Sequence, residues 1–179
     1  MRRVVVIGTS GSGKTTLAMR LASVLGVPHF EMDSLYHRPN WTHVDDEELA
    51  RQVASAAARP GWVMDGNYSR VRGIAWAPAD TIVWLDYPKW LVMVRVVRRS
   101  VHRAATKREL WHGNTERFRN LIKLDRDENI VLWAWTTHGQ TRARYEEAFA
   151  ADEWSSKSLI RLRSPREARR FLDDAVGSG

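Results

Sequence analysis

The chain contains short segments rich in Val, Ile, Leu and Trp, separated by longer stretches in which apolar residues recur every three or four positions. Short apolar runs bounded by Gly, Pro or Asp are typical of strands buried in a parallel sheet. They predict five strands, over residues 1–7, 27–33, 62–66, 81–86 and 157–162.

The longer stretches predict helices. The first of them places Leu17, Ala18 and Leu21 on one face and stops at Gly26. The helices are expected over residues 14–25, 46–59, 88–103, 128–149 and 165–176. Alternating strands and helices imply an α/β fold, a doubly wound parallel sheet with right-handed crossovers. With 179 residues and no internal repeat or linker, the chain is expected to form a single domain.

The loop after the first strand carries the pattern G-x-x-x-x-G-K-[ST], residues 8–15. Its glycines allow a tight turn whose N–H groups, with a helix N-terminus behind them, can bind phosphate. Lys14 can reach the β- and γ-phosphates of ATP, and Thr15 can bind Mg²⁺. A buried strand before the loop and a helix after it predict a three-layer P-loop NTPase fold. A protein with this loop is expected to use ATP and Mg²⁺. The residues expected to bind the nucleotide are Gly8, Ser10, Gly11, Ser12, Gly13, Lys14, Thr15 and Thr16.

Acidic residues end three of the predicted strands, at the edge of the sheet where the loop also lies. Asp65 is expected to hold Mg²⁺ together with Thr15. Asp33 is expected to orient or deprotonate the hydroxyl of an acceptor. For both residues the alternative is a capping or turn role. Asp86, two residues before Pro88, is interpreted mainly as a helix cap.

The net charge of +7 comes from one segment, because residues 89–126 hold eleven Lys or Arg against three Asp or Glu. A basic segment can bind nucleic acid or phosphorylated small molecules. We expect a lid over the phosphates at about residues 98–126. The absence of cysteine excludes disulfides and Cys-based metal sites. No apolar run is long enough to span a membrane, so a cytoplasmic protein is expected.

Two arginines of the basic segment, Arg95 and Arg99, are four residues apart and share one face of the predicted helix. They are expected to act on ATP from the lid side, with a solvated basic face as the alternative. Loops that follow strand ends are expected to bind the acceptor. The acceptor-binding candidates are Asp33, Arg38, Trp41, Asn67, Tyr68 and Arg70.

These motifs together resemble P-loop small-molecule kinases, and within them the adenylate kinase-related DNA topology modulation proteins (FlaR-like). The resemblance rests on residues 33–35 (Asp-Ser-Leu), 39–41 (Pro-Asn-Trp), 61–66 (Gly-Trp-Val-Met-Asp-Gly), 65–68 (Asp-Gly-Asn-Tyr), 79–88 and the Arg95–Arg99 spacing. It covers nearly the whole chain. It implies that Arg95 and Arg99 contact the adenine and phosphates of ATP, and that Asp33 stands where shikimate- and gluconate-type kinases hold the acceptor hydroxyl.

The leading hypothesis is an ATP- and Mg²⁺-dependent phosphotransferase of the nucleoside or nucleotide kinase type. Its catalytic residues would be Lys14, Asp33, Asp65, Arg95 and Arg99. The acceptor, a nucleotide or a small hydroxyl compound, is not assigned, and the protein is expected to be a monomer or homodimer. The alternatives are a nucleic-acid-binding protein with regulatory ATP binding and a plain NTPase switch.

Overall fold

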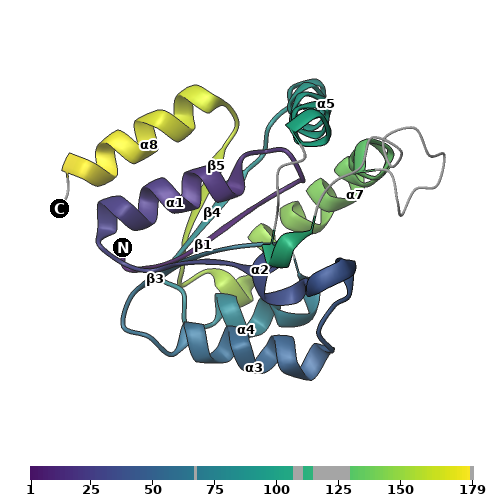
Figure 1. Cartoon of the computed structure of the whole chain (residues 1–179). Coiled ribbons are helices and arrows are strands. Elements are labelled where there is room, and N and C mark those ends of the chain that lie inside the picture. Colours follow the sequence, from purple (N-terminus) through teal and green to yellow (C-terminus); the bar gives the residue numbers. More distant parts are fainter. Residues whose placement is uncertain (67, 107–110, 115–129, 178–179) are drawn as a thin grey trace.

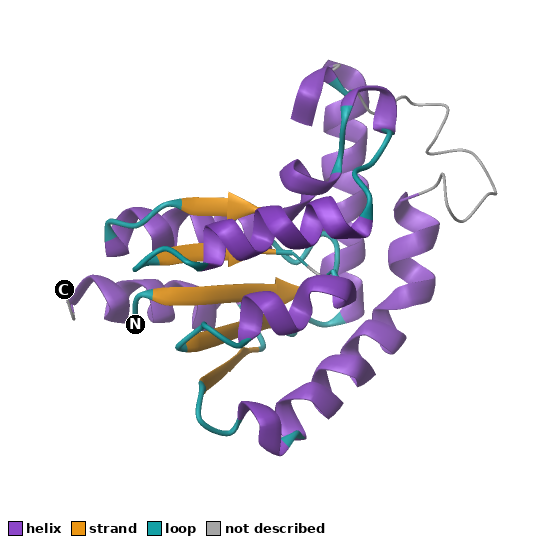
Figure 2. Cartoon of the chain, turned by 90° about the horizontal axis from the view of Figure 1, so that it is seen from below, coloured by secondary structure: helices purple, strands orange, loops and turns teal. Residues whose placement is uncertain are grey.

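A computed structural model describes residues 1–66, 68–106, 111–114 and 130–177. Its centre is a five-stranded sheet in which every neighbouring pair is parallel, in the order β2-β3-β1-β4-β5. The strands are β1 Arg3–Gly8, β2 His29–Glu31, β3 Trp62–Asp65, β4 Thr81–Leu85 and β5 Ser158–Leu162. Both termini lie at the opposite end of the sheet from the strand tips (Figures 1 and 2).

Helices cover both faces of the sheet (Figure 1). On one face lie α1 (Lys14–Leu25) and α8 (Pro165–Gly177), and on the other α3 (Asp46–Ala57) and α4 (Arg72–Trp76). Two longer helices, α5 (Lys89–Thr106) and α7 (Ile130–Ala150), pack on each other near the strand tips. None of the helices in the described ranges is long and apolar enough to cross a membrane.

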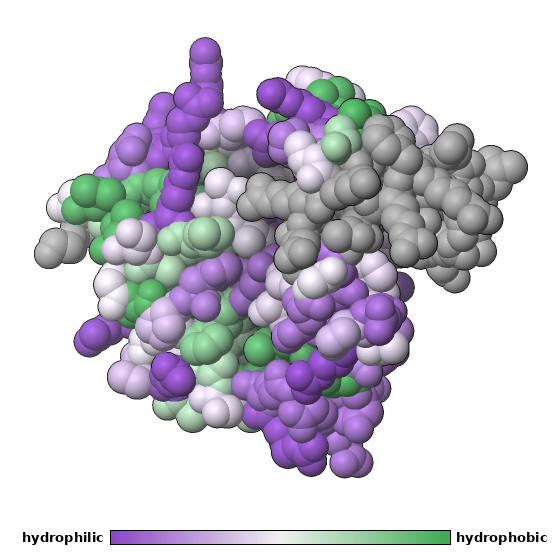
Figure 3. All heavy atoms as spheres, viewed as in Figure 1, coloured by the Kyte–Doolittle hydropathy of each residue, from purple (hydrophilic) through white to green (hydrophobic). Residues whose placement is uncertain are grey.

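The two cores follow from the alternation of side chains along the central strands. Val4 and Val6 of β1 face α1, whereas Val5 and Ile7 face α3 and α4. All four are at most 1 % exposed. The surface carries both hydrophilic and apolar side chains, and the hydrophilic ones gather over α3 at the bottom of Figure 3. The central strand is therefore closely packed on both faces up to the loop that leaves its carboxyl end.

The strand predicted over residues 27–33 is shorter than expected. β2 ends at Glu31, and Asp33 lies in a short helix, α2 (Met32–Tyr36), so its assignment to a strand end was wrong. Because β2 is the edge strand, it pairs only with β3. The buried side chain of Met32 and the hydrogen bond from Ser34 Oγ to the Glu31 carbonyl turn the chain into α2.

Asp86 is not a helix cap. Its carboxylate is buried and accepts hydrogen bonds from Arg161 Nε and Nη2, at 2.9 and 2.6 Å. Arg142 Nε lies 3.2 Å from Asp86 Oδ1, and Glu146 contacts both arginines. This ion-pair network joins the end of β4 to β5 and α7, and so fixes the outer part of the sheet.

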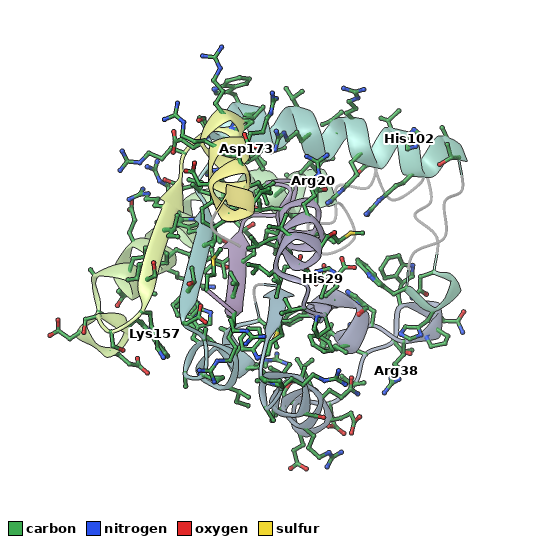
Figure 4. All side chains as sticks on the ribbon, turned by 90° about the vertical axis from the view of Figure 1, so that its left-hand side faces the viewer. Arg20, His29, Arg38, His102, Lys157 and Asp173 are labelled. Atoms are coloured by element: carbon green, nitrogen blue, oxygen red, sulfur yellow. The ribbon has the colours of Figure 1, made fainter. Side chains whose placement is uncertain are left out.

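Replacing Asp86 by Ala should lower the free energy of unfolding by about 2 kcal/mol, because Arg161 would lose its buried partner. The value is below that of a fully buried pair, since Arg161 is 25 % exposed. Chemical denaturation can measure it. The control is Asp173→Ala on the exposed side of α8 (Figure 4), which should change stability by less than about 0.5 kcal/mol. Equal effects of the two substitutions would contradict a structural role for the network.

Candidate functional site at the P-loop

The P-loop connects β1 to α1 through a turn that requires glycine. Gly11 has φ +81°, and Gly13 has φ +95° in a left-handed conformation at the N-cap of α1. A Cβ on Gly11 would lie 2.3 Å from Val96 Cγ2 and 3.2 Å from the Val92 carbonyl oxygen. The loop is therefore held closely against α5.

Two arginines of α5 hold the other side of this loop. Arg95 Nη1 donates to the Ser12 carbonyl at 2.9 Å, and Arg99 Nη2 donates to Ser10 Oγ at 3.2 Å. The guanidinium of Arg95 also lies 5.1 Å from the centre of the Tyr87 ring. The prediction that Arg95 and Arg99 share a face therefore agrees with the structure, which turns that face to the loop.

Lys14 lies among carboxylates at the centre of the site. Its ammonium contacts the Thr9 carbonyl at 3.4 Å. Burial lowers the pKa of Lys14 below its ordinary value, while the nearby carboxylates of Asp33, Asp65 and Glu31 oppose this shift. An ammonium that is partly desolvated in this way is stabilised by a bound anion.

Oxygen ligands converge beside Lys14. Thr15 Oγ1 donates to Asp65 Oδ2 at 2.8 Å and lies 3.3 Å from Glu31 Oε1. Asp65 is 2 % exposed, and its other oxygen accepts a hydrogen bond from His29 Nε2 at 2.7 Å. The pKa of Glu31 is raised, first by burial, while a hydrogen bond from Trp111 opposes the shift.

This arrangement fits ATP and Mg²⁺. The buried Ser12 Oγ of the loop has no hydrogen-bond partner in the described part of the chain. One hydroxyl and two carboxylates form a hard oxygen set of the kind that Mg²⁺ prefers. Within the described ranges no group of three or more His, Asp or Glu side chains forms a metal cage of its own. Mg²⁺ in phosphate sites is typically held by one or two carboxylates plus phosphate oxygens.

The expected acceptor residues are only partly brought together. Tyr68 donates its hydroxyl to Asp33 Oδ1 at 2.9 Å, which joins two of them beside Lys14. Trp41 is tied to the same region, since its N–H donates to Asn114 Oδ1. Arg70 instead pairs with Asp46 in an exposed position.

Two further candidates, Arg38 and Thr16, add little to the site. Arg38 lies 4.0 Å from Glu48 at the periphery of the molecule (Figure 4). Thr16 is exposed on α1. Asn67 and much of the predicted lid, residues 107–110 and 115–126, lie outside the described residues.

Three residues of the site were missed by the sequence analysis: Glu31, His29 and Trp111. The sequence does indicate Glu31, because it is an acidic residue near the end of a predicted strand. The analysis chose Asp33, two residues later, as the functional acid of that strand. A histidine inside an edge strand and a tryptophan in a basic segment carry no such signal. Trp111 reaches the site only because residues 111–114 pack against the chain after β2, where Trp111 Nε1 donates to Glu31 Oε2 at 2.9 Å.

Comparison with known proteins identifies the fold of the chain but does not assign it to a family. No protein-family model and no curated protein matches the sequence. Among solved structures, shikimate kinase from Acinetobacter baumannii in complex with shikimate matches with a TM-score of 0.56 and 12 % identity, over 99 % of this chain and 92 % of that one. Shikimate kinase from Aquifex aeolicus gives 0.55 and 13 %, over 98 % and 94 %.

A gluconokinase from Sinorhizobium meliloti 1021 matches with a TM-score of 0.50 and 17 % identity, over 99 % of this chain and 94 % of that one. All these identities are low, so the likeness concerns architecture. The narrower resemblance to FlaR-like proteins stays a prediction. The predicted three-layer α/β architecture is confirmed: this chain has the fold of the P-loop small-molecule kinases.

Proposed function

We propose that the protein transfers the γ-phosphoryl group of ATP to a hydroxyl of a small molecule, with Mg²⁺ as cofactor. The observation that carries this proposal is the convergence of Lys14, Thr15, Asp65 and Glu31 at the P-loop, with Asp33 beside them. An NTP-binding loop alone would also suit a switch. Asp33 adds a carboxylate, next to the phosphate site, that can serve an acceptor.

Each group has a role that its position supports. The P-loop N–H groups and Lys14 bind the β- and γ-phosphates, and Arg95 and Arg99 add positive charge from α5. Thr15, Asp65 and Glu31 would hold Mg²⁺. When bound, Mg²⁺ would neutralise negative charge on the phosphate oxygens.

Asp33 is the base of the proposed reaction. It accepts the proton of the acceptor hydroxyl while that oxygen bonds to the γ-phosphorus. The bond from this phosphorus to the β–γ bridging oxygen breaks, and ADP leaves. Tyr68 keeps Asp33 in place through its hydroxyl, and no hydrogen bond from the described residues reaches Asp33 Oδ2.

The test is ADP formation from Mg²⁺-ATP in the presence of nucleosides, nucleoside monophosphates and small hydroxyl metabolites in turn. Formation that depends on one class of acceptor, with a phosphorylated product detected by mass spectrometry, supports the proposal. ADP formation that no acceptor stimulates would favour an NTPase switch. The described residues give no specific reason to prefer nucleic-acid binding, since much of the basic segment lies outside them.

Asp65 depends on His29 for its orientation, which leads to a prediction on Mg²⁺. Replacing His29 by Ala should raise the Mg²⁺ concentration needed for half-maximal ATP binding by about tenfold, since outer partners orient the groups that hold metals. Calorimetric titration of ATP at several Mg²⁺ concentrations measures this. His102→Ala is the matched control, because His102 is exposed on α5 (Figure 4). An unchanged Mg²⁺ requirement in His29→Ala would contradict the proposal that His29 positions Asp65.

A further inference from the structure

The helix α5 is apolar on two opposite sides. On its inner side Val92 and Val96 are fully buried, and Val96 packs against the P-loop at Gly11. Four more apolar residues follow one another at spacings of four, three and four along the same helix, which places them on a single stripe of its outer side. We call them the α5 stripe: Trp90, Val94, Val97 and Val101.

The side chains of the α5 stripe are open to solvent. Trp90 is 67 % exposed and Val94 58 %, while Val97 and Val101 are 44 % and 46 % exposed. Figures 1 and 4 both place α5 at the upper edge of the molecule. The outer side of a surface helix is normally polar. A contiguous apolar stripe in this position therefore indicates a surface that binds a partner.

A second exposed tryptophan lies close to the start of the stripe. Trp135 of α7 is 54 % exposed, and its ring centre lies 3.6 Å from the Nζ atom of Lys89, the residue before Trp90. Tryptophan is enriched where an apolar phase meets water, because its ring is apolar and its N–H is polar. Two tryptophans at one end of an apolar stripe are therefore suited to a lipid–water interface.

The charge on α5 is entirely positive. The helix carries five Lys or Arg and no Asp or Glu. Arg95 and Arg99 turn toward the P-loop, but Arg98 is exposed next to Val97 at the edge of the stripe. Basic residues beside an apolar stripe attract a surface that is both apolar and negatively charged. The partner must therefore combine these two properties.

A second copy of the chain does not fit this requirement. In a symmetric pair α5 would face α5 of the partner, so that basic residues would meet basic residues. A stable protein interface also buries about 800 Å² on each partner, more than the four side chains of the stripe can expose by themselves. A protein groove would have to match a convex ridge in shape, whereas a fluid lipid surface takes up a helix that lies flat on it.

We propose that the α5 stripe docks on an anionic lipid membrane surface, with α5 lying in the plane of that surface. The apolar side chains enter the boundary between headgroups and acyl chains, and Arg98 and Lys89 meet the lipid phosphates. Docking of this kind needs no membrane-spanning helix. It leaves the ATP site accessible, because the stripe lies on the side of α5 opposite to the P-loop.

The experiment is co-sedimentation of the full chain with lipid vesicles at low and at high salt. Vesicles of phosphatidylcholine and phosphatidylglycerol in equal parts are compared with vesicles of phosphatidylcholine alone. Binding to the anionic vesicles should be at least about tenfold stronger and should weaken at high salt. Absence of binding to the anionic vesicles would overturn the proposal, and so would equal binding to both kinds of vesicle.

A double variant tests the apolar part of the surface. Val94→Gln with Val97→Gln should weaken binding to the anionic vesicles by about tenfold, since it removes half of the stripe and keeps residues that favour a helix. The affinity for a non-hydrolysable ATP analogue should stay within about twofold, which shows that the fold is intact. The matched control is Met19→Gln with Val176→Gln, because these residues are 57 % and 62 % exposed on α1 and α8. Equal loss in both double variants, or no loss in either, would contradict docking by the stripe.

A charge reversal tests the basic part. Arg98→Glu should weaken binding to the anionic vesicles by at least about tenfold, because a repelled charge replaces an attracted one at the surface. Arg169→Glu on the exposed side of α8 makes the same change in net charge and should have a smaller effect. Equal effects would assign the binding to the net charge of the chain and overturn the proposal. Light scattering adds one further outcome: a dimer that the stripe variant abolishes would assign the stripe to a second copy.

Discussion

Replacing Lys14 by Ala is expected to reduce phosphoryl transfer by about 10²- to 10³-fold, the usual cost of removing one preorganised charge from a transition state. The ammonium lies at the P-loop, where the β- and γ-phosphates of ATP would gain charge during transfer. The fold should survive, because burial lowers the pKa of Lys14 and the folded state therefore gains little from this charge. Steady-state turnover and thermal unfolding measure the two effects.

The control for this variant is Lys89→Ala. Lys89 lies on α5 with its ammonium 3.6 Å from the centre of the Trp135 ring. The Lys89→Ala variant should lose less than about half of the turnover, since Lys89 touches no group of the site. Normal turnover in Lys14→Ala would rule out the proposed chemistry, and loss of turnover in both variants would point to a general effect of reduced positive charge.

Replacing Gly11 by Ala is expected to lower the free energy of unfolding by about 2 kcal/mol and to weaken binding of Mg²⁺-ATP. Two causes add: a φ of +81°, which strains an L-residue, and the contact of the new Cβ with Val96. Val96 is fully buried and β-branched, so it cannot turn away easily. Denaturation and ATP titration would measure both effects.

Two further variants separate these causes. Gly73→Ala should not destabilise the protein, because Gly73 lies in α4 and a Cβ there would meet no atom within 4 Å. The double variant Gly11→Ala with Val96→Ala should recover ATP affinity relative to Gly11→Ala, since the clash with α5 is removed. Failure to recover would assign the whole effect to the backbone of the loop.

The P-loop was predictable because its function depends on the backbone and on adjacent residues. The phosphate-binding turn needs glycine at set spacings, and a strand and a helix on either side, all of which are local features. The placement of Arg95 and Arg99 was also predictable in part, since residues four apart on a helix share a face. The packing of α5 on the P-loop decided that this face contacts Ser10 and Ser12.

The acceptor side was harder to predict because it is assembled from distant segments. Glu31 and Trp111 are 80 residues apart, and Thr15 and Asp65 are 50 apart. Asp33 was named correctly as a residue near Lys14, although it comes from a helix and not from a strand. Asp86 looked like a cap because its two arginine partners follow far along the chain.

The sequence by itself therefore determined the order of strands and helices, the parallel α/β architecture and the glycine-rich P-loop, because these depend on periodicity and on neighbouring residues. Only the tertiary structure decided the partners of Asp65 and Glu31, the outward pairing of Arg70 and the hydrogen bond from Tyr68 to Asp33. The physical reason is that a hydrogen bond, an ion pair or a ring contact between distant segments depends on how the sheet and helices pack. No local pattern records that packing.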